Sequence, residues 1–132
     1  MDSSPERYIQ VVNITKGGVT IASEVTWAGT SKERRRGLLG RTGLSDDEGI
    51  YITPCEWLHT FGMKFPIDVA FLSEDGRILA LHHGLKPNRF SRIVPRAHGA
   101  LELMEGTLQR SGTSIGDTVL IVNSMTRELI SL

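Results

Sequence analysis

The fold is decided by residues 54–72, PCEWLHTFGMKFPIDVAFL. From Pro66 to Leu72, alternate side chains point to opposite faces of a strand, and both faces are apolar except at Asp68. A strand that is apolar on both faces is typical of the centre of a sheet. Residues 54–65 show no regular period. We therefore interpret them as a loop that brings reactive side chains to the end of this central strand.

The segments around this strand predict more strands joined by short turns. Gly17-Gly18 and Asp75-Gly76 have the composition of tight turns between antiparallel strands, because glycine adopts the positive φ angles that such turns need. We expect strands over residues 8–14, 19–27, 49–53, 66–72, 77–83, 100–104 and 118–122.

Two short helices complete the prediction. Thr30 and Glu33 have the spacing of a capping box, and Gly40 is expected to end the helix that they begin. A second helix is expected over residues 105–111, closed by Gly112. Strands outnumber helices, so the sequence predicts a mainly β domain (α+β by content), either a compact antiparallel β-sandwich or a small barrel. We expect the whole chain, residues 1–132, to form one domain with a flexible N-terminus at 1–7.

Composition excludes several classes of protein. The chain has 132 residues, 39% of them hydrophobic, with 15 basic and 15 acidic side chains, so its formal net charge is zero. A dedicated nucleic-acid-binding protein is usually basic. The single cysteine excludes an internal disulfide and a cysteine-based zinc site. The polar N-terminus lacks a signal-peptide core, and no apolar run approaches the ~20 residues of a membrane span. We expect a cytoplasmic protein with no cofactor and no membrane partner.

An ordered series of short motifs resembles a known family. The series contains RRRGLLGRTGL at 34–44, PIDVAFL at 66–72, the turn at 75–76, LEL at 101–103 and the pair Gly116-Asp117. Together these motifs are similar to the bacterial and archaeal family called domain of unknown function 192. The resemblance covers nearly the whole chain and implies a compact, mainly β fold without an assigned activity. Many relatives carry a Trp-Met-Lys-Asn-Thr-like run where this chain has His59 to Met63, so no family-wide catalytic role for His59 is implied.

Cys55, His59 and Asp68 contain the parts of a thiol enzyme. A cysteine nucleophile needs a nearby base, and an acid can orient that base. The alternative interpretation is a small, largely buried, non-catalytic thiol beside an amphipathic histidine. We expect the second interpretation, because Cys55 follows Pro54 at the end of an apolar strand.

A metal site is not predicted. His59, His82, His83, Asp68 and Cys55 are ligand types, but His82 and His83 are adjacent on a strand and face opposite sides. The chain has no His-x-His or His-x-x-x-His pair.

Asp68 is the most informative single residue. A carboxylate on an apolar strand is costly unless partners meet it, so we expect Asp68 to be buried and bonded to an arginine side chain, to backbone N–H groups, or to both. The arginines at 34–36 and 41 are the candidate partners. An arginine that meets Asp68 and also faces a pocket would bind an anionic ligand.

The preferred functional hypothesis is a binding module. Its pocket would lie at the end of strand 66–72 and take a small anionic or polar ligand; its expected residues are Trp57, His59, Met63, Asp68, Arg36 and Arg41. The alternative is a hydrolase-like enzyme that uses Cys55 or His59 with Asp68. Basic side chains also gather at 32–41 and 86–96, with Phe90 among them, but zero net charge favours a solvated loop over a nucleic-acid site. The identity of the ligand and the oligomeric state are left open.

Overall fold

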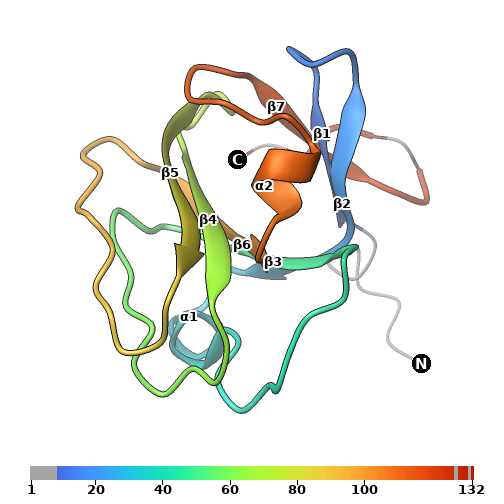
Figure 1. Ribbon diagram of the computed structural model, residues 1–132. Helices are drawn as coiled ribbons and strands as arrows, with labels where there is room; N and C mark the ends of the chain where they lie inside the picture. The colour runs from blue at the N-terminus through green and yellow to red at the C-terminus, as the bar shows by residue number, and fades with distance from the viewer. Residues whose placement is uncertain (1–8, 127, 131) are drawn as a thin grey trace.

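Seven strands form one sheet in the part of the chain that the computed structural model describes, residues 9–126, 128–130 and 132. The strands follow the order β5-β4-β6-β3-β2-β1-β7, and every neighbouring pair is antiparallel except β2 and β3 (Figure 1). The elements are β1 (Ile9–Asn13), β2 (Val19–Ala28), α1 (Ser31–Arg36), β3 (Glu48–Ile52), β4 (Ile67–Leu72), β5 (Ile78–Leu85), β6 (Gly99–Met104), α2 (Thr107–Arg110) and β7 (Val119–Asn123). The predicted mainly β domain with two short helices is confirmed, and its sheet is a curled half-barrel.

The two edge strands of the sheet meet at one end. The turn before β5 reaches the start of β7: Ile78 N–H donates to Asp117 O at 2.8 Å, and Val119 N–H donates to Gly76 O at 2.9 Å. Gly76 has a φ of 85°, and a Cβ atom there would lie 2.4 Å from Val119 O. The predicted Asp75-Gly76 turn therefore joins β4 to β5 and also brings the sheet edges together, a task that only glycine can perform at this position.

The sheet is covered on both faces. Its concave face packs around Leu101, Leu103 and the α2 residue Leu108. Its convex face carries Val69 and Phe71 under the buried Leu38, which follows α1. All six residues of β4 are buried. The prediction that β4 is a central strand with two apolar faces is confirmed.

Helix α1 begins as the sequence predicts and ends earlier. Thr30 Oγ1 accepts from Glu33 N–H at 3.1 Å, and Glu33 Oε1 accepts from Thr30 N–H at 3.0 Å, which completes the capping box. The helix stops at Gly37, whose φ is 44°, and not at Gly40. The predicted end was wrong because Gly37 already turns the backbone out of the helix, and this turn aims Leu38 into the convex-face core.

Two long loops lie side by side over the convex face, residues 53–66 and 86–98 (Figure 1). His59 and Phe90 form an antiparallel bridge. The buried Thr60 hydroxyl donates to Lys86 O at 2.6 Å and accepts from Arg89 N–H at 2.9 Å. The paired loops therefore form one fixed wall beside α1.

The flexible N-terminus expected at residues 1–7 lies outside the described residues. Neither described helix is long and apolar enough to cross a membrane.

Candidate functional site

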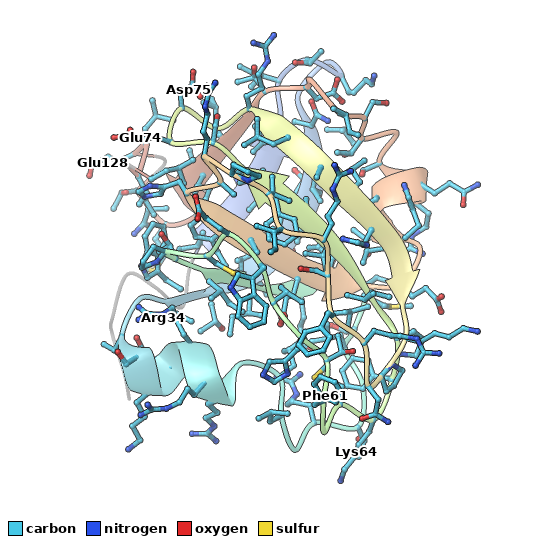
Figure 2. The ribbon with its side chains drawn as sticks, turned by 90° about the vertical axis from the view of Figure 1, so that its left-hand side faces the viewer. Arg34, Phe61, Lys64, Glu74, Asp75 and Glu128 are labelled. Atoms are coloured by element: carbon cyan, nitrogen blue, oxygen red, sulfur yellow. The ribbon has the colours of Figure 1, made fainter. Side chains whose placement is uncertain are left out.

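A cleft of about 1020 Å³ separates α1 from the loop of residues 53–66; we call it the α1 cleft. Figure 2 shows Arg34 on α1 and Phe61 on the loop at the same end of the molecule, whereas Asp75 lies at the opposite end. Residues from α1, the loop and the convex face line the cleft: Ser31, Arg34, Arg35, Arg36, Gly37, Leu38, Leu39, Ile52, Pro54, Cys55, Glu56, Trp57, Leu58, His59, Phe61, Met63, Ala97 and Glu102.

One wall of the α1 cleft is basic and the other is aromatic. Arg35 and Arg36 are exposed on the last turn of α1. On the loop, Trp57 and Phe61 are 49% and 43% exposed. The His59 ring lies between them, with ring centroids 6.4 Å from Trp57 and 5.3 Å from Phe61. Large aromatic groups left this open at a cleft are typical of binding surfaces.

Arg34 has a different role from the other two arginines. Its guanidinium Nη1 donates to Gly29 O at 2.8 Å and to Thr53 O at 3.4 Å, at the ends of β2 and β3. These bonds hold the half-buried Arg34 against the backbone of the sheet. Arg34 therefore positions α1, which leaves Arg35 and Arg36 to face solvent.

The floor of the α1 cleft holds a buried acid, Glu102 on β6. Its neighbours across the sheet are Ile50 on β3 and Val69 on β4. Glu102 is 5% exposed, and its Oε1 atom has no hydrogen-bond partner among the described residues. Burial raises the pKa of this carboxyl to about 7, because an apolar environment disfavours the charged form.

Cys55 is half-buried at the side of the α1 cleft, and not largely buried as the sequence suggested. Its Sγ donates to Trp57 O at 3.1 Å. Burial, and next the charge of Glu102, raises the pKa of the Cys55 thiol to about 11. A thiol with this pKa is almost entirely protonated at neutral pH, which is the opposite of an activated nucleophile.

His59 and Asp68 do not form a catalytic set with Cys55. His59 is exposed, and its Nδ1 accepts from Phe61 N–H at 3.2 Å. Asp68 lies on the other side of β4, where its face continues with Ala70 and Leu72 into the concave core. The three side chains are therefore not brought to one place.

Asp68 is buried and bonded to backbone N–H groups, which are one of the two kinds of partner that the sequence predicted. It is 1% exposed. Its Oδ1 accepts from Gly84 N–H at 2.9 Å, and its Oδ2 accepts from Gly106 and Leu108 N–H, each at 3.0 Å. No arginine side chain bonds to it among the described residues.

These bonds tie three elements together. Gly106 is the N-cap of α2 and has no side chain, so the carboxylate of Asp68 supplies the acceptor that a capping residue would normally provide. The bond to Gly84 attaches β5 at the point where its register with β4 shifts. Asp68 thus fastens α2 and β5 to β4.

The remaining expected site residues divide between two hollows. Trp57, His59, Met63 and Arg36 line the α1 cleft. Arg41 lines a second hollow of about 920 Å³ on the other side of α1, where its Nη2 lies 2.8 Å from Glu48 Oε2. Arg36 borders both hollows.

Glu102 was not predicted as a site residue. The signal was present, because Glu102 is a carboxylate in the apolar strand GALELM, the same pattern that drew attention to Asp68.

Metal-ligating side chains are dispersed in the described part of the chain, where no group of three or more His, Cys, Asp or Glu residues could hold an ion. His82 lies beside Phe71, with ring centroids 6.3 Å apart, and its Nε2 accepts from Arg92 N–H at 3.3 Å.

Comparison with known proteins places this geometry in a family. The model of DUF192, described as uncharacterized ACR, matches residues 12–121. The chain belongs to the DUF192 family. No curated protein matches it.

Two crystal structures are similar to this DUF192 domain. One is a protein of unknown function from Novosphingobium aromaticivorans DSM 12444, with 25% identity and a TM-score of 0.72 over 84% of this chain and 81% of that chain. The other is a protein from Sinorhizobium meliloti 1021 called a candidate transcription regulator, with 26% identity and a TM-score of 0.71 over 84% of this chain and 89% of that chain. The fold is therefore shared.

Proposed function

We propose that this DUF192 domain is a binding module whose α1 cleft takes a small anionic or polar ligand. The proposal rests on one observation: Arg35, Arg36 and the exposed aromatic side chains line the same cleft of about 1020 Å³. Clefts of roughly 300–1,000 Å³ that combine apolar walls with a few polar groups are the usual form of small-molecule sites. In this proposal the protein acts in the cytoplasm, without a membrane or nucleic-acid partner.

The chemistry of the basic wall favours an anionic group on the ligand. Arg35 and Arg36 are exposed and near each other in sequence on one short helix, and neither has an acidic partner within salt-bridge distance among the described residues. An arginine fork matches the two oxygens of a carboxylate or phosphate. The opposite wall supplies Trp57, His59 and Phe61 for the apolar body of such a ligand.

The hydrolase-like alternative has less support. It requires an ionisable nucleophile near a base and an acid, whereas the pKa of Cys55 is raised to about 11 and Asp68 lies across the sheet. We therefore assign no catalytic role to Cys55, His59 or Asp68 in this proposal.

A thermal-shift screen tests the binding module. Wild-type protein is melted with phosphate and with small mono- and dicarboxylates, because a specific ligand raises Tm by mass action. The Arg35→Ala/Arg36→Ala double variant should lose the shift. Arg77→Ala, which removes an exposed arginine beside the distant turn at Asp75, is the matched control and should keep it.

Two outcomes contradict the proposal. Equal shifts in the double variant and the wild type would remove the α1 cleft as the site. A salt-sensitive complex with RNA or DNA that is lost in an Arg89→Ala/Arg92→Ala variant would replace the small ligand with a nucleic acid.

A further inference from the structure

We propose that Glu102 is a ligand-binding residue, and that the ligand carries an amine which enters the α1 cleft first and bonds to this carboxyl. The inference rests on the proposed function and extends it, because it names a second recognition group on the ligand. Together with the arginine wall, it defines the ligand class as a compact zwitterion: an amine at the buried end, an apolar body, and an anionic group at the open end.

The first step is the position of the carboxyl. Glu102 projects from the middle of β6 onto the convex face, and it lines the α1 cleft although only 5% of the residue is exposed. A Cβ atom on Gly37 would lie 3.9 Å from Glu102 Oε1, so the end of α1 covers the carboxyl from one side. The carboxyl therefore lies at the floor of the cleft, with its Oε1 atom enclosed.

The second step is the missing partner. Buried polar side chains in proteins are almost always hydrogen-bonded, and a buried acceptor without a partner costs roughly 1–3 kcal/mol. Glu102 Oε1 has none among the described residues. Arg34, which lines the same cleft, donates instead to Gly29 O and Thr53 O. A ligand that donates hydrogen bonds would satisfy the free carboxyl.

The third step is the charge distribution in the cleft. The titratable or charged side chains that line it with Glu102 are Arg34, Arg35 and Arg36 from α1, and Cys55, Glu56 and His59 from the loop. Glu56 is exposed, and its Oε2 accepts from Arg96 N–H at 3.1 Å, so it is turned toward the second loop. Positive charge therefore lies on the α1 wall and the one enclosed acid lies at the floor. A molecule with an anionic end and an amine end complements both.

The fourth step predicts a pH dependence. With its pKa raised to about 7, the Glu102 carboxyl is largely protonated at pH 5 and largely ionised at pH 8. An ammonium group binds the ionised form, so binding should strengthen as the pH rises between these values. The Cys55 thiol, with its pKa raised to about 11, stays neutral across this range, and the Glu102→Gln variant separates the contribution of Glu102 from that of the other side chains in the cleft.

Matched pairs of probes test the inference. We would compare 6-aminohexanoate with hexanoate, and 4-aminobutanoate with butanoate; the members of each pair differ only in the amine. Affinities are measured by calorimetry at pH 5 and pH 8 for the wild type, Glu102→Gln and Arg35→Ala/Arg36→Ala. A ¹³C label on the glutamate carboxyls reports whether the Glu102 signal moves to its ionised position when a probe binds at pH 6.5.

The expected result is specific to Glu102. In at least one pair, the amine-bearing member should bind the wild type ten times or more tightly than its partner, bind better at pH 8 than at pH 5, and shift the Glu102 signal. Glu102→Gln should abolish this difference while the amine-free member keeps its affinity.

Failure of the inference is distinguishable from failure of the proposed function. If the amine-free members bind through the arginines, and neither the amine nor Glu102→Gln changes affinity, the binding module stands and the role of Glu102 is refuted. If no probe binds the wild type, the zwitterionic ligand class is refuted. The thermal-shift screen with anions then decides separately whether the arginines bind a ligand.

Discussion

Two buried carboxylates on neighbouring strands have opposite surroundings. Asp68 on β4 faces the concave core, and Glu102 on β6 faces the convex side; each lies directly beside the other's strand, because Val69 pairs with Glu102 and Asp68 pairs with Leu103. Asp68 accepts three backbone hydrogen bonds. Glu102 Oε1 accepts none from the described residues. The same residue chemistry is fully satisfied on one face and left open on the other.

The difference teaches which acid belongs to the fold and which to the site. Removing the partners of a buried polar group is costly, so a carboxylate bonded to Gly84, Gly106 and Leu108 contributes to stability. A carboxylate that is enclosed at a cleft floor without a partner costs stability, and such a cost is typical of functional positions. Replacing Asp68 should therefore lower the free energy of unfolding, whereas replacing Glu102 should raise it.

The largest effect is expected at Asp68. Asp68→Ala leaves one buried and two partly buried N–H groups without their acceptor, which should lower the free energy of unfolding by roughly 4 kcal/mol. Asp68→Asn keeps one side-chain oxygen as an acceptor and should cost less. Urea denaturation of both variants measures this, and a wild-type midpoint for Asp68→Ala would show that the three bonds do not hold α2 and β5 in place.

Glu102→Gln should act in the opposite direction at high pH. Because the folded-state pKa is raised from 4.5 to about 7, the folded protein holds the proton more tightly than the unfolded chain. The stability that the proton provides is fully present below pH 4.5, is lost as the pH rises to 7, and is absent above it. Glutamine cannot ionise, so the variant should gain up to about 3 kcal/mol over the wild type between pH 4 and pH 8.

Denaturant melts at pH 4, 6 and 8 check this. The difference between Glu102→Gln and the wild type should grow with pH, whereas a control such as Glu74→Gln at the exposed turn should show no such trend. A constant difference across the three pH values would mean that the Glu102 carboxyl titrates normally in the folded protein.

The sequence predicted much of the architecture from local patterns. The alternation in β4, the Asp75-Gly76 turn and the Thr30/Glu33 capping box each depend on residues close together in the chain, and all three are confirmed. The parallel pairing of β2 with β3 was not predicted, because it depends on how residues 29–47 return the chain and not on any local period. The predicted end of α1 was wrong for a similar reason. The helix could end at Gly37 or at Gly40, and the docking of Leu38 on the sheet decides between them.

The candidate site was predicted less well than the fold. Trp57, His59, Met63 and Arg36 do share a cleft, because the loop between β3 and β4 must return beside α1. Asp68 was assigned to the same pocket, although it lies on the opposite face of the sheet. The alternation in residues 66–72 shows which side chains share a face of the strand, but not which part of the protein covers that face. Glu102 was missed although its strand carries the same signal, since burial at a cleft floor depends on α1 and the loop meeting above β6.

The pKa of the Cys55 thiol provides another test of the contrast between Glu102 and Asp68, with a smaller expected effect. The charge of Glu102 helps to raise the pKa of the thiol to about 11, so Glu102→Gln should lower this pKa, and Asp68→Asn should leave it unchanged because Asp68 lies across the sheet. The rate of labelling by a thiol reagent, followed from pH 7 to pH 10, reports the thiolate fraction. Fast labelling of the wild type at pH 7 would contradict the assignment of Cys55 as a non-catalytic thiol.

The smallest effect on stability is expected at Trp57, on the open wall of the α1 cleft. Its side chain is 49% exposed and lies near two other exposed rings, His59 and Phe90, with ring centroids 6.4 Å and 6.1 Å away. Surface substitutions outside special features usually change stability by no more than about 0.5 kcal/mol. Trp57→Ala should therefore leave the urea midpoint nearly unchanged while weakening any ligand held against the aromatic wall. A large loss of stability would instead show that the Trp57 ring supports the loop, and the aromatic wall would then belong with Asp68 to the fold.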